Sequence, residues 1–194
     1  MAADTPRVYA VSGTQGAGKT TVAAILARRF DRGVHISADT LQKMIVSGRV
    51  WPEADAVTRE TPEVTGDAGM QLRLRLRNAC ILARSFYEHG FTAVIDDIIF
   101  GDRFVELLDE VGDLPLHVVM LVPDLATVRA HERERGTNLW PEWEWLTESI
   151  ASSRPRLGLW LDNSGQTPEN TVDEIIRRSD EARVAPAILS ERMQ

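Results

Sequence analysis

The segment that decides the fold is Gly13-Thr14-Gln15-Gly16-Ala17-Gly18-Lys19-Thr20, which has the pattern G-x-x-x-x-G-K-[ST]. An apolar run from Val8 to Ser12 precedes it, and a helical pattern from Lys19 to Phe30 follows it. Glycines let such a loop curl so that successive backbone N–H groups point at phosphate oxygens, and the N-terminus of the next helix favours negative charge. The sequence therefore predicts a phosphate-binding loop. The alternative, a glycine-rich turn that binds nothing, does not explain the complete motif between its two flanks.

The residues of this loop predict a site for ATP and Mg²⁺. Lys occurs only at Lys19 and Lys43 in a chain whose other basic residues are Arg, so its place after the glycines is not a matter of frequency. We expect Lys19 to bridge the β- and γ-phosphates and the hydroxyl of Thr20 to bind Mg²⁺, a cation that prefers oxygen ligands. The predicted nucleotide contacts in this part of the chain are Gly13, Thr14, Gln15, Gly16, Ala17, Gly18, Lys19, Thr20 and Thr21.

Composition limits the choice of partners. The 194 residues are 43% hydrophobic, which suits one domain over residues 1–194, and 22 basic against 29 acidic side chains give a net charge of -7. This balance disfavours a nucleic-acid partner and favours a small molecule. The single cysteine, Cys80, excludes an internal disulfide, and no apolar run is long enough to cross a bilayer. We expect a cytoplasmic protein, and the sequence leaves its oligomeric state open.

Short apolar runs alternate with helical stretches along the chain, which predicts an α/β fold with a five-stranded parallel sheet flanked by helices, in three layers. The expected strands are Val8–Ser12, Val34–Ser37, Thr92–Asp96, His117–Val122 and Leu159–Asp162. The expected helices are Lys19–Phe30, Thr40–Val46, Gly69–Glu88, Asp102–Val111, Leu125–Arg135, Glu142–Ser153 and Pro168–Ala185. Asp124 and Thr167 are expected N-caps. Leu72 to Arg77 alternates like a strand, but apolar residues at spacings of three and four around it indicate a helix.

Asp39 follows the second expected strand, at the sheet edge where ligands bind in open α/β folds. A carboxylate there can act as general base and accept the proton of an attacking hydroxyl. The alternative is that Asp39 only caps the helix that begins at Thr40.

Asp96 and Asp97 end an apolar strand, where a carboxylate can hold Mg²⁺ directly or through water. Because adjacent strand residues point to opposite faces, the two cannot act identically. We assign the metal to Asp96 and a substrate contact to Asp97. The alternative is a solvated pair at the strand end.

The segment from Val128 to Arg135 resembles a lid, and we expect a mobile lid over about 129–145. Arg129 and Arg133 share a helix face, so one guanidinium can stack on the base while the other reaches the transferred phosphoryl group. We assign a catalytic role to Arg133 and nucleotide contacts to Arg129 and Arg135. The alternative is an ordinary solvated Glu/Arg face, and His131 is expected at the surface.

The acceptor is expected to enter through a helical region of about residues 40–90. Arg49, Trp51 and Arg77 are candidate substrate contacts there, Trp51 as a flat wall and the arginines as charges. Trp140, Trp143 and Trp145 cannot all face one side of a helix, and core packing is the better expectation for each.

Together, the glycine loop, Ser37-Ala38-Asp39-Thr40-Leu41, Val94-Ile95-Asp96-Asp97 with Gly101, the Arg-rich helix end and Leu161-Asp162-Asn163-Ser164-Gly165 resemble the chloramphenicol phosphotransferase-like kinases of the P-loop nucleoside and nucleotide kinase superfamily. The resemblance runs from about Val8 to Ile176. It implies ATP-dependent phosphorylation of a substrate hydroxyl with Asp39 as base. It also implies that the turn containing Ser164 lies beside the adenine.

Three functions remain open at this point. The first is an O-kinase for a small molecule, an antibiotic or a metabolite. The second is a kinase for nucleotides, sugar nucleotides or RNA ends, a class that includes toxins that phosphorylate sugar nucleotides. The third is a nucleotide-dependent switch, which would need no base at Asp39.

Overall fold

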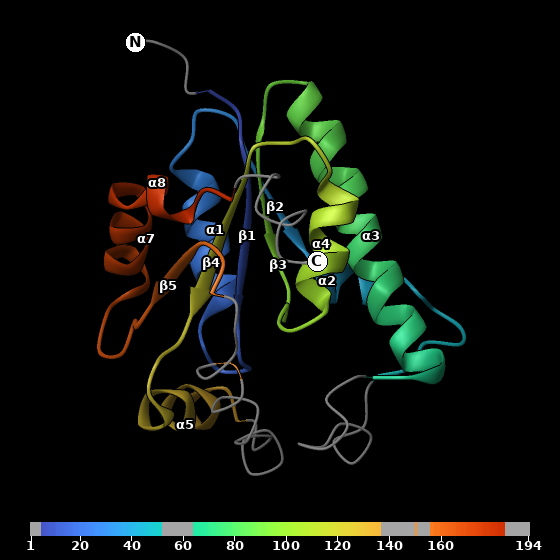
Figure 1. Ribbon diagram of the computed structural model, residues 1–194. Helices are drawn as coiled ribbons and strands as arrows, with labels where there is room; N and C mark the ends of the chain where they lie inside the picture. The colour runs from blue at the N-terminus through green and yellow to red at the C-terminus, as the bar shows by residue number, and fades with distance from the viewer. Residues whose placement is uncertain (1–4, 52–63, 137–149, 151–155, 185–194) are drawn as a thin grey trace.

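The computed structural model describes residues 5–51, 64–136, 150 and 156–184 (Figure 1). Five parallel strands form one sheet in the order β2-β3-β1-β4-β5. They are β1 (Val8–Gly13), β2 (Gly33–Ser37), β3 (Thr92–Asp96), β4 (Leu116–Leu121) and β5 (Leu159–Leu161). The predicted five-stranded parallel sheet is confirmed.

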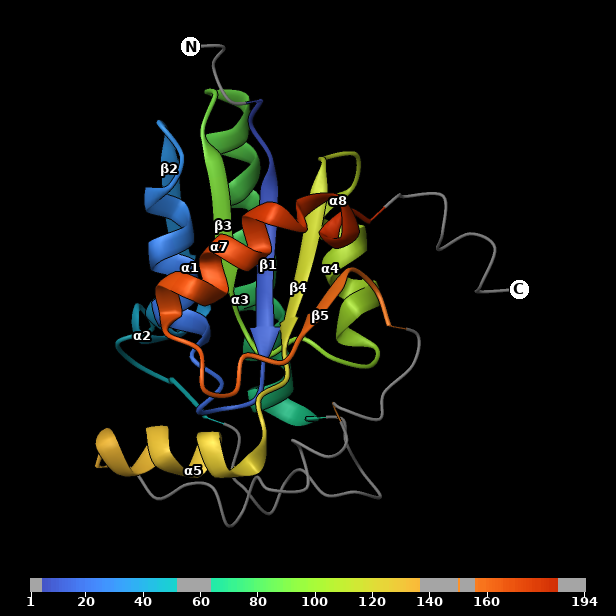
Figure 2. The same ribbon diagram turned by 90° about the vertical axis from the view of Figure 1, so that its left-hand side faces the viewer.

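Helices cover both faces of the sheet. On one side lie α1 (Lys19–Arg28), α7 (Pro168–Arg177) and the short α8 (Ser179–Ala182), and on the other lie α3 (Gly66–Glu88) and α4 (Arg103–Val111). In Figure 2, α7 crosses in front of the strands, whereas α3 and α4 lie behind them. The three-layer arrangement is therefore confirmed.

Alternation along the strands divides the core into two halves. In β1, Val8 and Ala10 join the cluster under α3 and α4, whereas Tyr9 and Val11 join the cluster under α1 and α7. All six residues of β1 are buried, because it is the central strand and both of its faces are covered.

Two helices lie at the carboxyl edge of the sheet. The helix α2 (Ala38–Lys43) follows β2 directly, and α5 (Leu125–Glu134) follows β4 and crosses beneath the strand ends (Figures 1 and 2). The carboxylate of Asp124 accepts a hydrogen bond from the Thr127 amide at 2.7 Å, and Thr167 caps α7 in the same way. Both predicted N-caps are confirmed.

Helix α3 buries a stripe at helical spacing. Leu72, Leu76, Ala79 and Ala83 are buried, and the last three pack in the core cluster with the sheet, so the helix interpretation of the alternating segment is correct. Cys80 is a buried free thiol on the same helix, and burial raises its pKa to about 12. A thiol with this pKa stays protonated and unreactive at neutral pH.

The C-terminal helix is shorter than expected. The helix predicted over Pro168–Ala185 ends at Arg177, and α8 follows only as a single turn. The chain then becomes extended, and Val184 donates its amide hydrogen to Leu116 O at 2.9 Å while Arg183 pairs antiparallel with His117. Pairing with the amino end of β4 takes the place of the last predicted helical turns. The predicted helix Glu142–Ser153 lies outside the described residues except for Ile150, which is helical and buried.

Within the described part of the chain, no helix has the length and apolar character needed to cross a membrane.

Candidate active site

The glycine loop connects β1 to α1 as predicted, and its conformation explains its composition. Gly16 and Gly18 have φ values of 77° and 87°, in the left-handed region that favours glycine. Gly18 is the N-cap of α1 and offers no side-chain cap, and the first turn of α1 contains no acidic residue. The backbone N–H groups of this turn are therefore left for an anion.

The loop also packs closely against α5. A Cβ atom at Gly16 would lie 2.9 Å from Val128 Cγ1 and 3.1 Å from Val128 O. His131, which we expected at the surface, is half-buried, and its Nδ1 lies 2.8 Å from Gly16 O. That expectation for His131 is wrong, because the histidine faces the loop and ties α5 to it.

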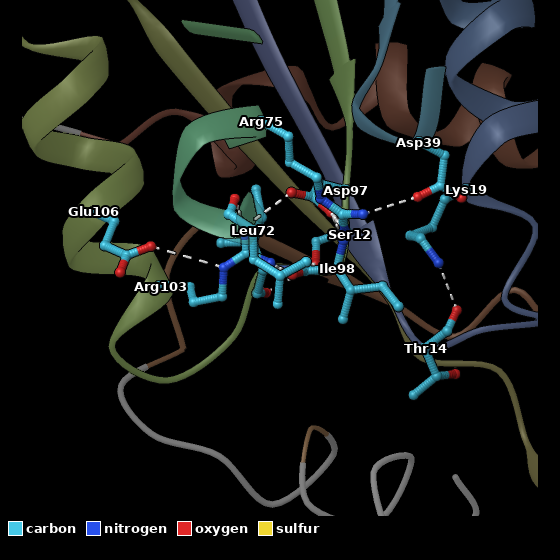
Figure 3. A network of polar contacts seen from close by, with 11 residues as sticks. Ser12, Thr14, Lys19, Asp39, Leu72, Arg75, Asp97, Ile98, Arg103 and Glu106 are labelled. Carbon is cyan, nitrogen blue, oxygen red and sulfur yellow. Dashed lines mark hydrogen bonds and ion pairs between the residues drawn. The ribbon is translucent and has the colours of Figure 1, made fainter. Parts of the chain in front are cut away.

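Lys19 folds back over the loop. Its Nζ donates to Thr14 O at 2.8 Å (Figure 3). Burial lowers the pKa of Lys19 to about 8, although the nearby charges of Asp96, Asp39 and Asp97 act in the opposite direction. A half-buried ammonium group is well served by a bound phosphate, which would replace the lost hydration with negative charge.

Asp39 lies beside Lys19 at the carboxyl edge of the sheet (Figure 3). It occupies the first turn of α2, whose N-cap is Ser37, so Asp39 is not the cap of this helix. Its Oδ1 accepts a hydrogen bond of 3.1 Å from Arg75 Nη1, and 63% of its side chain is exposed. A carboxylate anchored on one side and exposed on the other is suited to receive a proton from an incoming group.

Asp97 lies behind this site, in the interior. Its carboxylate is fully buried and forms ion pairs with Arg75 Nη2 and, at 3.0 Å, with Arg103 Nη2. The Ile98 amide adds a hydrogen bond of 2.7 Å to Oδ1. Because both carboxylate oxygens already have protein partners, the structure does not present Asp97 to a substrate, contrary to our expectation.

Asp96 has different surroundings, although it is also buried. Its Oδ2 lies 2.9 Å from His35 Nε2 on the neighbouring strand β2. The solvated pair considered above is therefore wrong for both aspartates. Asp96 thus has a histidine beside one carboxylate oxygen, whereas Asp97 has an arginine on each of its two oxygens.

The donors present fit a magnesium ion that arrives with a nucleotide. Thr20 is exposed in the first turn of α1, and the charge of Asp96 acts on the adjacent Lys19. Among the described residues there is no group of three or more His, Cys, Asp or Glu side chains that could hold a metal alone. Mg²⁺ is commonly bound in this way, through one or two protein oxygens together with phosphates and water.

The arginines of α5 are distributed over different environments. Arg129 is half-buried, whereas Arg133 and Arg135 are exposed, and Arg135 Nη1 lies 3.9 Å from Glu132 Oε1. Glu132 is buried under the loop, and its Cγ would lie 3.4 Å from a Cβ at Gly16. The face of α5 next to the loop is thus packed, not merely solvated. Residues 137–145 of the predicted lid lie outside the described residues.

The turn that contains Ser164 contacts both the loop and α5. Asn163 Nδ2 donates to Ala17 O at 3.2 Å, and Ser164 Oγ accepts from the Asp124 amide at 2.7 Å. Ser164 is therefore adjacent to the start of α5, and Asn163 adjacent to the loop.

Two of the three candidate acceptor residues lie beside the site, and the third does not. Gln42 and Gln71, both buried, hold the segment around Val50 through its backbone N–H and C=O, which leaves Arg49 and Trp51 exposed beside α2 and α3. Arg77 is not brought to the site, because its Nε points to Glu110 Oε2 of α4 at 3.9 Å and its side chain is 64% exposed. Arg75, two positions earlier, occupies the site instead.

Sequence reasoning missed four residues of this site: His35, Arg75, Arg103 and His131. For Arg75 a signal existed, since it lies three residues after Leu72 and one before Leu76, on the buried stripe of α3. The charge of Arg75 and the alternation of Leu and Arg around it predict an exposed side chain instead.

The sequence and the fold were compared with known proteins. The family model for Zeta toxin matches residues 1–80, which include the loop, Asp39 and Arg75. No curated protein matches the chain.

Three solved structures share the fold. A Janibacter sugar kinase has a TM-score of 0.61 at 16% identity, covering 94% of this chain and 98% of its own. The Mycobacterium tuberculosis APS kinase in complex with AMPPNP and APS has a TM-score of 0.63 at 15% identity, covering 90% and 98%. The Deinococcus radiodurans tunicamycin resistance protein has a TM-score of 0.60 at 18% identity, covering 93% and 99%. None of the three is a chloramphenicol phosphotransferase, so that resemblance stays a prediction. The chain has the α/β fold of P-loop kinases, and its first 80 residues are similar to the Zeta toxin family.

Proposed function

We propose that the chain is an ATP-dependent phosphotransferase that moves the γ-phosphoryl group to a hydroxyl of a small molecule. The observation that carries this proposal is the exposed carboxylate of Asp39, fixed on one side by Arg75 and set beside the loop lysine. A protein that only binds nucleotide has no use for a base at this position.

In this proposal each group has one task. The loop amides and Lys19 bind the β- and γ-phosphates, and the nucleotide is bordered by α5 with Arg129 and Arg135 and by the turn with Ser164. Arg133 reaches the transferred phosphoryl group, and Asp39 takes the proton of the acceptor hydroxyl. Mg²⁺, held by Thr20 and Asp96, would neutralise charge on the phosphates.

The proposed acceptor region is formed by α2, α3 and the segment between them, within residues 40–90. Arg49 and Trp51 remain candidate contacts there, since both are exposed next to the two helices that carry Asp39 and Arg75. A small acceptor is consistent with the net charge of -7, which would repel a nucleic-acid backbone.

The test is release of ADP from Mg·ATP over a panel of hydroxylated antibiotics, sugars, nucleosides and sugar nucleotides. We expect Asp39→Asn to bind ATP as the wild type does but to lose about 10²- to 10⁴-fold in the rate of transfer, the usual contribution of a general base.

Lys19→Ala is expected to abolish transfer, and Arg133→Ala is expected to lower mainly the turnover number. An Asp39→Ala variant with full biological function would favour a nucleotide-dependent switch instead.

A second candidate, a kinase for nucleotides or sugar nucleotides, is favoured by the match of residues 1–80 to the Zeta toxin family. The same panel separates it from the first candidate. ADP release with sugar nucleotides, and none with antibiotics or simple sugars, would establish the second.

A further inference from the structure

We infer that Arg75 is the positioning residue of the proposed base, so that transfer depends on Arg75 acting through Asp39. This inference rests on the function proposed above. Figure 3 shows the guanidinium of Arg75 between the carboxylates of Asp39 and Asp97, with one nitrogen toward each. Arg75 comes from α3, Asp39 from α2 and Asp97 from the position directly after β3, so one side chain joins three parts of the fold.

Arg75 is itself held firmly from the interior. It is only 6% exposed, and Asp97, its inner partner, is fully buried and paired with Arg103 on its other oxygen. Arg103 in turn donates to Ile98 O at 2.6 Å and to Leu72 O at 3.2 Å, which fixes it against α3 and the segment that follows β3. The position of Arg75 is therefore set by the core, because Asp97 and Arg103, with the backbone of Ile98 and Leu72 that holds Arg103, would have to move with it.

Asp39 has no comparable support of its own. Its side chain is 63% exposed, and the described part of the chain gives it one polar partner, Arg75 Nη1 on Oδ1. Oδ2 receives no hydrogen bond from the described residues, so in this proposal it is the oxygen left to take the proton of an acceptor. Without Arg75, the carboxylate would be free to change rotamer in solvent, and loss of orientation by about 1 Å can reduce a rate by about 100-fold.

The chemistry is balanced as follows. The acceptor O–H bond breaks and its proton passes to Asp39 Oδ2, while the acceptor oxygen forms a bond to the γ-phosphorus. The bond from the γ-phosphorus to the β–γ bridging oxygen breaks, and ADP leaves with that oxygen. Arg75 stays on Oδ1 throughout and takes no proton. Only a guanidinium can serve, because its planar fork reaches two carboxylates at once, which a lysine ammonium at the same position would not do.

The experiment compares Arg75→Met and Arg75→Lys with Arg77→Met as the matched control. Arg77 lies on the same helix, is exposed, and pairs with Glu110 away from the site. The readouts are ADP release with the best acceptor of the panel and with water alone, the dissociation constant of Mg·ATP, and the thermal midpoint. We expect both Arg75 variants to lose about 100-fold in turnover with the affinity for Mg·ATP kept, and Arg77→Met to match the wild type.

A double-mutant cycle separates positioning from a structural role. If Arg75 acts through Asp39, then adding Arg75→Met to an Asp39→Asn protein does not lower the turnover further. A general loss of structure would instead lower the turnover by the same factor in the wild-type and the Asp39→Asn proteins. Additive losses, or unchanged turnover in a folded Arg75→Lys protein, would overturn the inference. If Arg75→Met does not fold, Arg75→Lys carries the cycle, since it keeps a positive charge next to Asp97. Full activity of Asp39→Asn alone would instead overturn the proposed base, and the Arg75 role with it.

Discussion

His117 is a buried histidine at the amino end of β4, far from the loop. Its ring centroid lies 4.9 Å from that of Tyr9, and its Nδ1 lies 3.3 Å from Pro115 O. Burial lowers the pKa of His117, and the charges of Arg7 and Arg183 act in the same direction, whereas Asp180 and the Pro115 carbonyl oppose them. The folded protein therefore keeps this imidazole neutral at pH values where the unfolded chain would protonate it.

This difference predicts acid sensitivity with a defined sign. Below about pH 6.5, the ordinary value for histidine, the unfolded chain binds a proton that the folded one does not, so the free energy of unfolding falls as the pH falls. We expect His117→Gln to flatten this dependence between pH 7 and pH 5 in urea unfolding. His89→Gln, at an exposed histidine, is the control. An equal slope in wild type and His117→Gln would contradict the prediction.

The contact of the loop with α5 predicts different outcomes for substitution of two glycines that have similar φ values, 77° at Gly16 and 87° at Gly18. Gly16 and Gly18 both have positive φ, but a Cβ at Gly16 would collide with Val128, whereas a Cβ at Gly18 would meet nothing within 4 Å. We expect Gly16→Ala to lower the thermal midpoint of the nucleotide-free protein more than Gly18→Ala, because only the first pushes α5 away. Differential scanning calorimetry without nucleotide measures this, and equal midpoints would show that strain alone decides.

Individual elements were predictable where one local pattern governed them. The strand before the loop, the long helix α3 and the N-caps at Asp124 and Thr167 follow from apolar spacing and capping chemistry, and all are confirmed. The end of α7 was not predictable in this way. Arg178 leaves the helix with φ −105° and ψ 22° and bonds to Glu174 and Glu181, and the chain beyond it pairs with β4, a contact that no local pattern encodes.

The candidate site is likewise predictable from local sequence only in part. The loop and the position of Asp39 follow from motif and spacing, because their neighbours in sequence are also their neighbours in space. The link from Asp39 through Arg75 to Asp97 and Arg103 joins residues that are far apart in the chain, so only the packed fold reveals it. The sequence therefore predicts a substrate contact at Arg77, whereas the fold brings Arg75 to Asp39.

The two halves of the core share one sheet, and this predicts a single unfolding transition. Leu26 of α1 lies fully buried on one face, and Leu107 of α4 lies fully buried on the other. Each truncation to Ala should cost about 2–5 kcal/mol through lost burial and a residual cavity. Because neighbouring residues of β1 belong to opposite halves, we expect one cooperative step with an unchanged denaturant slope in both variants.

The measurement is guanidinium unfolding followed by far-UV circular dichroism and by tryptophan fluorescence. Coincident curves for Leu26→Ala and Leu107→Ala would support one cooperative unit. A second transition in either variant would show that the two halves of the core melt separately.

The strand order delays strand pairing while the protein is synthesised on the ribosome. The central strand β1 is synthesised before both of its neighbours, since Val8 pairs with Ala93 of β3 on one side and with Leu116 of β4 on the other. Such distant pairings close slowly, and an apolar strand without partners is prone to aggregate. The central strand of the nascent chain therefore lacks a partner on one edge until β4 has left the exit tunnel, and during that interval a chaperone would have an exposed apolar strand to bind.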